Sequence, residues 1–430
     1  MLTITQISEK SQPIKRASSA SEYMRALVEI LLFLLLVFAT VTVWERHAWA
    51  IQTFQIFIFA LVAAQLVFGI SLQSKAIASG VLPLLVYLIP AWGVIQIVFH
   101  TTTSSFDTRE AVQRWASLAG VFFLTQTITC SKTMRQRFLA AALCFATAMA
   151  ILFLLQINTS EGRVLWVFPT GFSRVYAPFQ SQNNYVQFVE VAFPIALWGA
   201  VRSGWRSWWY AIAAGVMYAS AVGAASRAGF ILCTAELLTV AILGLVRARQ
   251  IKANFSVRSA APVILIVPIV AGTFTFAVGW DQVLARFKDE DPFIHRREFF
   301  FGAVDMAKHR PLTGYGLDTF ERVYQQFAVK DIGVYANHAH NDWAEFAADG
   351  GIPFFLLVFI PFLAAVPTAW RHPWGLGLVA TMLHACVDYP FPRPGVSCWM
   401  FAMLAVLYMT RRSDQEQALP RKQTRQAEMP

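Results

Sequence analysis

Two closely spaced histidines are the residues of this sequence best suited to acid–base chemistry. His338 and His340 lie in a polar segment that runs to Glu345, and Asp342 and Glu345 have the spacing of a helix-capping box. We therefore expect both histidines just before a helix N-terminus, where an anionic ligand is favoured. A neutral imidazole, which titrates at about pH 6.5, can act there as a general base.

The same segment allows two other interpretations. His338, His340 and Asp342 match the start of a metal-binding HxHxDH motif, but Trp343 follows instead of a histidine, and the loop has no evident further ligands. Two histidines in an ordinary solvated loop would also look like this. The residues alone leave all three interpretations open.

Arg227 is a second unusual residue, because it lies between two apolar runs that almost no loop separates. A charge deep in a membrane costs about 2.5–3.5 kcal/mol on insertion scales. If Ser226 caps the following helix, Arg227 also lies in the first helical turn, where the helix dipole disfavours a cation. A bound anion would resolve both problems, and so would a side chain that reaches the lipid headgroups.

Other polar residues flank the apolar runs. Within the segment 157–183, Arg163 and Arg174 precede amides that suit sugar hydroxyls or phosphates, although an ordinary exposed loop has the same composition: Gln180, Gln182, Asn183 and Asn184. His384 and Asp388 are four residues apart and would share a helix face. This spacing predicts a structural hydrogen bond between them.

The composition shows which kind of fold must hold these residues. Of the 430 residues, 57% are hydrophobic and only 14% are charged, which excludes an ordinary water-soluble protein. Apolar runs of about 20 residues match the thickness of a bilayer, and uninterrupted runs exclude a β-barrel. The net charge of +10 is spread among loops, which indicates membrane topology rather than nucleic-acid binding.

We predict an all-α polytopic membrane protein with about twelve transmembrane helices. Each range is approximate at its ends: 24–44, 49–72, 76–100, 114–130, 137–156, 184–201, 207–225, 228–246, 261–279, 352–370, 374–390 and 396–410. The predicted organisation is a cytoplasmic segment 1–23, spans one to nine within 24–279, a periplasmic catalytic loop 280–351, spans ten to twelve within 352–410, and a cytoplasmic tail 411–430.

The distribution of lysine and arginine residues predicts how the chain is oriented in the membrane. With the N-terminus inside, 20 of them fall in inner segments and 7 in short outer segments, which predicts that both termini are cytoplasmic. The loop 280–351 then faces outward. It is expected to hold an amphipathic helix near 293–309, with Phe300, Val304 and Ala307 on one side, then a turn at 311–316 (PLTGYG) and a helix that ends near Gly350 and Gly351.

Several motifs together resemble the O-antigen ligase and polymerase superfamily of bacterial envelopes. They are the run from Arg296 through PLTGYG to His340-Asn341-Asp342 and Gly350-Gly351, the residues 226–229 (SRAG), and the closing His384 and 388–391 (DYPF). The resemblance covers about residues 170–410. The first five predicted spans match the superfamily only in hydropathy.

The resemblance implies transfer of a polysaccharide from undecaprenyl diphosphate to a hydroxyl, at the periplasmic face of a bacterial inner membrane. It implies that Arg227 and Arg296 clamp the diphosphate, and that His340, or failing that His338, deprotonates the attacking hydroxyl. Direct displacement predicts inversion, and no metal or other cofactor is required. We assign further substrate contacts to six residues: Arg163, Arg174, Asn183, Arg297, Asn341 and Asp388.

Within the superfamily we favour the ligase, whose acceptor is the lipid A-core oligosaccharide. The polymerase, which extends a chain on another lipid-linked repeat unit, and a protein O-oligosaccharyltransferase are alternatives. A secondary transporter is an alternative from another class, but the longest loop is external and follows span nine, unlike the central connection of major facilitator proteins. The predicted partners are the lipid-linked donor, the lipid A-core acceptor and membrane lipids, without nucleic acid.

Overall fold

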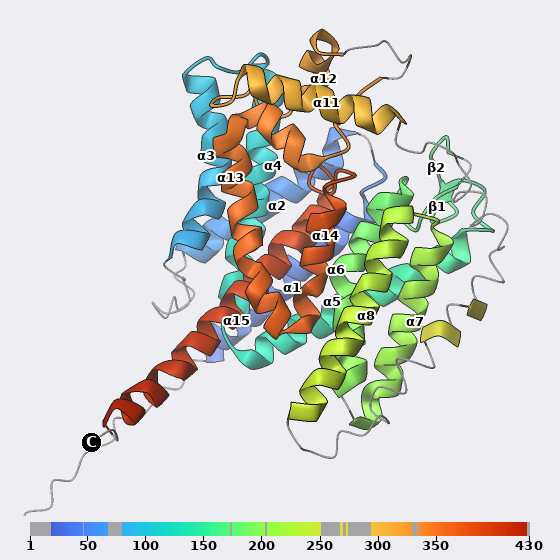
Figure 1. The fold of residues 1–430 in the computed structure, drawn as a ribbon, viewed down its shortest axis with the longest axis vertical. Helices are drawn as coiled ribbons and strands as arrows, with labels where there is room; N and C mark the ends of the chain where they lie inside the picture. Colours follow the sequence, from blue (N-terminus) through green and yellow to red (C-terminus); the bar gives the residue numbers. More distant parts are fainter. Residues whose placement is uncertain are drawn as a thin grey trace, which may run out of the picture.

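The computed structural model describes a bundle of packed α-helices (Figure 1). Among the described residues one short antiparallel hairpin, made of β1 (Arg163–Val164) and β2 (Phe168–Pro169), is the only sheet. The residues that the structure describes are 19–45, 47–67, 80–172, 174–202, 204–250, 267–269, 272–273, 294–328, 333 and 335–427.

The named helices fall on either side of the segment 251–293. Before it come α1 (Ser19–Val41), α2 (Ala48–Val67), α3 (Val81–Val98), α4 (Ser105–Ile128), α5 (Lys132–Gln156), α6 (Gln182–Arg202), α7 (Ser207–Gly223) and α8 (Arg227–Gln250). From residue 294 onward come α11 (Ile294–His309), α12 (Phe320–Val323), α13 (Asp342–Arg371), α14 (Leu376–His384) and α15 (Pro394–Ala427).

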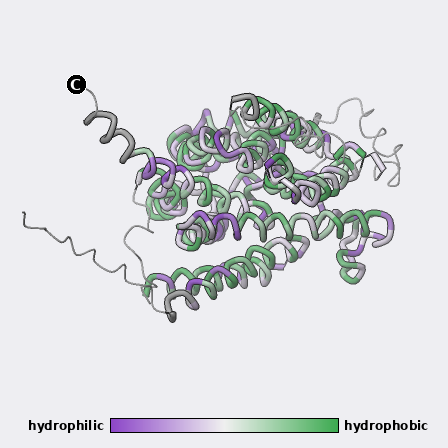
Figure 2. The backbone as a smooth tube through the Cα atoms, turned by 90° about the horizontal axis from the view of Figure 1, so that it is seen from below, coloured by the Kyte–Doolittle hydropathy of each residue, from purple (hydrophilic) through white to green (hydrophobic). Residues whose placement is uncertain are grey.

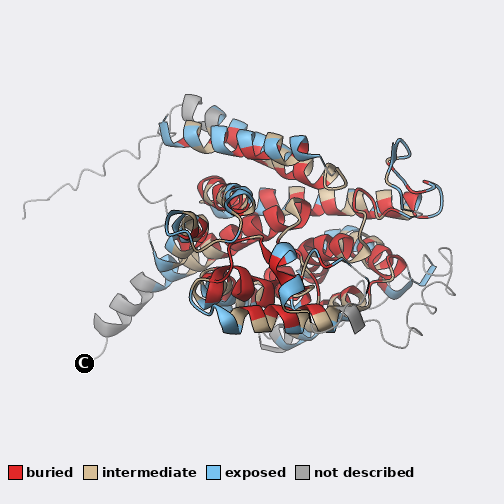
Figure 3. Ribbon diagram, turned by 90° about the horizontal axis from the view of Figure 1, so that it is seen from above, coloured by how far each residue is buried: buried red, intermediate tan, exposed pale blue. Residues whose placement is uncertain are grey.

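Two groups of helices meet along α6 and α14. Helices α1 to α4 pack with α13 and α15, while α5 to α8 pack on one another, and α14 contacts both α6 and α13 (Figure 1). Gly377 permits the close approach of α14 to α6, because a Cβ at this position would lie 2.2 Å from the carbonyl oxygen of Glu190. The described side chains between the groups are largely buried (Figure 3).

Five of the described helices are long and apolar enough to cross a membrane, namely α2, α3, α5, the segment Arg227–Val246 of α8, and α13. Hydrophobic residues run along most of the length of the bundle (Figure 2), and large apolar side chains such as Phe57 and Leu84 point outward. Lipid is the solvent that suits such an exterior. The chain is therefore a helical membrane protein, as the composition predicts.

The count of twelve spans stays a prediction. Helix α7 has 17 residues and α14 has 9, both shorter than the roughly 20 residues that cross a bilayer. The ninth predicted span, 261–279, lies almost entirely outside the described residues. The eleventh, 374–390, is shorter than predicted, because α14 ends at His384 and the chain then turns.

Aromatic side chains pack around the first turns of α13. The Trp115 ring of α4 lies 5.5 Å from both Phe346 and Phe354 of α13, and about as close to Phe391 and Phe401. Such edge-to-face pairs contribute about 0.5–1.5 kcal/mol beyond the burial of their area. They fix the start of α13 against α4, α15 and the segment that precedes α15.

Helix α11 lies across one end of the bundle, near the start of α13 (Figure 1). It covers the predicted range, and its fully buried face is made of Phe299, Ala303 and Met306. The expected residues Phe300 and Val304 are partly buried beside that face. The apolar side therefore lies about one position earlier than the sequence suggests.

The predicted turn at 311–316 docks on a break in α13. Gly351 interrupts the helix with φ 71° and ψ 177°, a backbone conformation that glycine adopts without a steric penalty. The buried Gln96 amide donates to the carbonyl oxygens of Thr313 and Asp349 at 2.7 and 2.9 Å, and Ile352 N–H donates to Pro311 at 2.8 Å. These bonds hold the turn at 311–316 against α3 and the break in α13.

Candidate functional site

The predicted histidine segment lies directly before α13. Asn341 caps this helix, since its Oδ1 accepts a 3.0 Å hydrogen bond from Ala344 N–H, and its Nδ2 donates to the carbonyl oxygen of Cys386 at 2.7 Å. The histidines therefore precede a helix N-terminus as expected, although the cap is Asn341 and not Asp342. The amide group of Asn341 is engaged in holding the backbone.

His338 has a carboxylate partner. Its Nδ1 lies 2.9 Å from Oε1 of Glu345, while Oε2 of the same carboxylate accepts a 2.6 Å hydrogen bond from Ala339 N–H. The imidazole stacks on the Tyr389 ring at a centroid distance of 4.4 Å. With 18% of its side chain exposed, His338 is partly accessible.

His340 lies against the other side of the same cluster. Its ring meets Tyr389 edge to face at 4.8 Å and stacks at 6.2 Å on Phe299 of α11. Its Nδ1 lies 3.4 Å from Oδ1 of Asp388, within ion-pair distance but without an aligned hydrogen bond. The two predicted histidines thus share one aromatic neighbour and face different carboxylates.

Asp388 joins most of the predicted site residues. Its Oδ2 accepts a hydrogen bond from the Asn183 amide and lies 3.8 Å from Nη2 of Arg296, while Oδ1 accepts from Tyr389 N–H at 3.0 Å. Its side chain is only 2% exposed. Burial raises the pKa of Asp388, but the adjacent His340 and Arg296 outweigh that effect and lower the pKa to about 2.

Arg296 connects this carboxylate to α11. Its Nη1 donates to the carbonyl oxygen of Val387 at 2.8 Å, and 29% of its side chain remains exposed. The guanidinium carries five donors, so it can hold the backbone and still bind a ligand. Arg297, next along α11, is exposed.

The N-terminus of α8 reaches the same cluster through Asn183. Ser226 Oγ donates to Asn183 Oδ1 at 2.8 Å and accepts from Gly229 N–H at 3.2 Å, so it caps α8 as the sequence predicts. Arg227 is the first residue of that helix and is partly exposed. Residues from α6, α8, α11, α13 and the turn after α14 therefore converge at one place.

Two of the predicted site residues, Arg163 and Arg174, lie apart from this cluster. Arg163 belongs to the β1–β2 hairpin and Arg174 to the loop that follows it, and both are exposed. Among the described residues, none of the hydrogen bonds or ion pairs joins either side chain to the cluster. Their predicted contact with substrate stays a prediction.

The predicted hydrogen bond between the side chains of His384 and Asp388 is wrong. Helix α14 ends at His384, so the two residues share no helix face, and His384 Nδ1 instead lies 2.8 Å from Oε1 of Glu190 on α6. Both side chains of that pair are fully buried. Neither Glu345 nor Tyr389 was predicted to have a functional role, because their side-chain contacts depend on the tertiary fold.

The three residues of the incomplete metal-binding motif contact separate partners. His338 faces Glu345, His340 faces Asp388, and Asp342 Oδ2 accepts a 3.0 Å hydrogen bond from Phe391 N–H. In the part of the chain that the structure describes, no three such side chains gather as a metal-binding group.

A family model described as O-antigen ligase matches residues 212–359. This match supports the O-antigen ligase superfamily. No curated protein matches the chain. The matched segment contains Arg227, Arg296 and both histidines, and Asn183 and Asp388 complete the cluster from outside it.

The match fits the ligase and polymerase superfamily as a whole and does not separate the two activities. Members of the O-antigen ligase family are glycosyltransferase-like enzymes that in general use a lipid-linked glycan donor.

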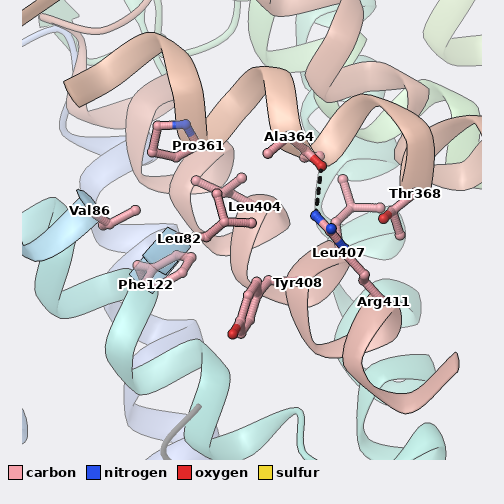
Figure 4. A pocket seen from close by; sticks show the side chains of 11 residues that line it. Leu82, Val86, Phe122, Pro361, Ala364, Thr368, Leu404, Leu407, Tyr408 and Arg411 are labelled. Carbon is pink, nitrogen blue, oxygen red and sulfur yellow. Dashed lines mark hydrogen bonds between the residues drawn. The ribbon is translucent and has the colours of Figure 1, made fainter. Parts of the chain in front are cut away.

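An apolar pocket lies well away from the cluster. It is lined by α3, α4, the second half of α13 and α15, with Arg411 donating to the carbonyl oxygen of Ala364 at 3.4 Å (Figure 4). Pro361 and Thr368 of its wall are near the opposite end of α13 from the histidines. The lining of this pocket contains none of the predicted site residues.

Proposed function

We propose that this protein is an O-antigen ligase, which transfers a polysaccharide from undecaprenyl diphosphate to a hydroxyl of the lipid A-core oligosaccharide. The observation that carries the proposal is the convergence of Arg296, His338, His340 and Asp388 at the N-terminus of α13. In this proposal the cluster lies at the periplasmic face of the bacterial inner membrane, and both termini are cytoplasmic.

Cations at this site suit a diphosphate leaving group. Negative charge develops on the oxygen that leaves the anomeric carbon, and preformed donors that meet this charge are the largest source of rate enhancement in many enzymes. Arg296 and Arg227 are proposed to grip the diphosphate oxygens, since a guanidinium forms two parallel hydrogen bonds with phosphate. The N-terminus of α13 adds further positive potential.

The acceptor hydroxyl must lose a proton as it attacks. One of the two histidines, His340 or His338, takes that proton while the new bond from oxygen to the anomeric carbon forms and the bond to the diphosphate breaks. A single displacement inverts the anomeric carbon. Asn183, Asp388 and Asn341 hold the site together, and Arg163, Arg174 and Arg297 are proposed contacts for the glycan.

The polyprenyl chain of the donor requires an apolar surface. A groove between α1 and α2 is lined almost entirely by aliphatic and aromatic side chains, including Leu34, Phe38 and Phe57, with Thr53 as the single polar one in its lining. Burying a chain of isoprene units there gains about 0.8 kcal/mol per CH₂-sized group. We assign this groove to membrane lipid or to the donor's tail.

A transfer assay with purified protein tests the proposal. The protein receives a lipid-linked glycan together with either lipid A-core or a lipid-linked repeat unit. We expect glycan on lipid A-core, with inversion at the anomeric carbon. Product on the repeat unit would identify a polymerase, product on protein an O-oligosaccharyltransferase, and no transfer to any acceptor would exclude the proposed activity.

A further inference from the structure

The tip of the β1–β2 hairpin is both apolar and exposed. The hairpin stands at the edge of the bundle (Figure 1). Val167 at its tip is 62% exposed, and the neighbouring Trp166 and Phe168 are 42% and 41% exposed. Turns that face water are usually polar, and grouped apolar side chains on a surface mark contact with a partner or a membrane. The hairpin tip is therefore a candidate interaction surface.

The backbone of the tip favours other residues than those present. Val167 N–H donates to the carbonyl oxygen of Val164 at 3.1 Å, and the two central residues of this turn, Leu165 and Trp166, have φ of 54° and 60°. Asn and Gly are preferred at such positions, because other side chains clash with the backbone there. The bulky apolar side chains of Leu165 and Trp166 thus do not serve the turn itself.

The tip is held at the level where helices enter the membrane. Trp44, which follows α1, stacks on Phe168 at 4.6 Å and 25°, and its carbonyl oxygen accepts from Gln180 Nε2 at 3.0 Å. Helix α2 begins at Ala48 and α5 ends at Gln156, and both are among the described helices that can cross a membrane. The hairpin follows α5 and contacts the segment that precedes α2, so it lies at one face of the bilayer.

The apolar surface continues from the tip along the outside of the bundle. Trp49, at the start of α2, is 50% exposed and meets Phe38 of α1 edge to face at 6.3 Å. Phe38 and Phe57 belong to the lining of the groove between α1 and α2. Tryptophan is enriched where a protein crosses from lipid to water. The hairpin tip is therefore continuous with the lipid-facing exterior of α1 and α2.

We propose that Trp166, Val167 and Phe168 insert into the bilayer interface and anchor the segment 157–181 to the membrane surface. The partner is the lipid bilayer itself, at the face where the polar cluster lies. The proposal goes beyond the proposed function and does not depend on it, because insertion can be measured without any transfer of glycan.

The chemistry of the tip favours lipid over a glycan. The single polar group of its three side chains is Trp166 Nε1, which donates its one proton to Thr159 Oγ1 at 2.9 Å. The tip therefore has no further side-chain donor or acceptor to offer sugar hydroxyls. Arg163 and Arg174, at the foot of the hairpin, would lie at the level of the headgroups, where a lipid-linked glycan also emerges.

Aromatic contacts connect the hairpin to the polar cluster. Tyr176, just after the hairpin, stacks on Phe153 at 6.0 Å, and Phe153 stacks on Tyr185 of α6 at 4.7 Å. The Tyr176 hydroxyl donates to Gln182 at 3.2 Å, and Asn183 of the cluster is the next residue. A membrane anchor at the tip would thereby set the depth at which α6 begins and Asn183 lies.

Hydroxyl-radical footprinting of the unmodified protein, with one copy in each lipid nanodisc, tests the proposal directly. Tyr335, an aromatic residue that is 64% exposed, is the reference. After correction for the reactivity of each residue type, we expect Trp166 and Phe168 to be oxidised about an order of magnitude more slowly than Tyr335, because lipid excludes the water in which the radical forms. Neither a second copy nor a glycan is present to give this protection. Oxidation of the tip as fast as that of Tyr335 would overturn the proposal.

A nitroxide label on Val167→Cys measures the depth of the tip. The accessible cysteines are first replaced by serine, namely Cys130, Cys144 and Cys386, while the buried Cys233 and Cys398 remain. Phe57→Cys is the reference in lipid, and Lys308→Cys, on the exposed side of α11, is the matched reference in water.

We expect the label at position 167 to collide more often with oxygen than with a water-soluble nickel complex, as at position 57 and opposite to position 308. A label at 167 that behaves like the one at 308 would overturn the proposal. The footprint of the unmodified protein decides if Val167→Cys does not fold. Because neither measurement uses transfer, failure of the proposed function would leave both results unchanged.

Discussion

Two of the imidazole–carboxylate pairs among the described residues have almost the same geometry in different surroundings. In the outer pair, His338 Nδ1 lies 2.9 Å from Glu345, and in the inner pair His384 Nδ1 lies 2.8 Å from Glu190. The outer histidine is 18% exposed, whereas both side chains of the inner pair are fully buried. Only the outer pair can present its second ring nitrogen to a substrate.

The difference shows that a carboxylate partner does not by itself make a histidine reactive. Nε2 of His384 is buried and makes no hydrogen bond within the described residues. The inner pair joins α6 to α14 where Gly377 lets the two helices approach closely. Its role is to position the turn after α14, from which Asp388 and Tyr389 reach the outer site.

The largest expected effect comes from breaking the inner pair. Glu190→Leu leaves His384 buried without its partner, which typically costs about 3–5 kcal/mol. We expect a marked fall in the temperature of thermal unfolding in detergent, and loss of transfer in proportion to loss of folded protein. Glu345→Gln, which alters a partly exposed pair, should unfold close to the wild-type temperature.

The double variant Glu190→Leu with His384→Leu makes this comparison more stringent. Replacing a buried ion pair by apolar side chains of similar volume is often neutral, so the double variant should recover most of the lost stability. If Glu190→Leu unfolds at the wild-type temperature, the inner pair is not a structural link between α6 and α14.

Features of the site that depend on local structure, such as helix caps, can be predicted from the sequence. Ser226 caps α8, and the histidines precede a helix, because capping is set by residues within one turn. The cap of α13 is one residue earlier than predicted, at Asn341. This shift frees Glu345 from the expected capping box and turns its carboxylate toward Ala339 and His338.

Contacts between distant segments could not be predicted in this way. Asn183 and Asp388 are 205 residues apart, and Glu190 and His384 are 194 apart. Each pairing depends on how α6 packs against α14, which hydropathy does not specify. The error at His384 has a similar cause, since Pro390 indicates that the helix must end nearby without fixing where.

A smaller effect, on the transfer rate and not on stability, is expected from replacing Arg296 in the outer site. Arg296→Ala removes a cation that should face the developing charge of the diphosphate, and such losses lower turnover by about 10²–10³. Arg296→Lys should recover only part, because an ammonium lacks the planar pair of donors. The measurements are initial transfer rates and donor binding in folded protein.

Lys308→Ala is the matched control, since Lys308 is an exposed cation of the same helix that pairs only with the nearby Asp305 among its described contacts. A surface pair of this kind contributes little to stability. Equal transfer rates for Arg296→Ala and Lys308→Ala would show that Arg296 does not stabilise the charge of the diphosphate.

The last prediction concerns divalent metals, whose removal should leave the transfer rate unchanged. In the outer site His338 is hydrogen-bonded to Glu345, and Asp342 is buried with Oδ2 bonded to Phe391 N–H. Among the described residues, the HxHxD side chains do not gather as a metal-binding group. Transfer rates should therefore be unchanged after exhaustive EDTA treatment and exchange into metal-free buffer. Loss of activity that zinc restores would instead make the outer histidines metal ligands, and the two imidazole–carboxylate pairs would then differ in metal binding as well as in exposure.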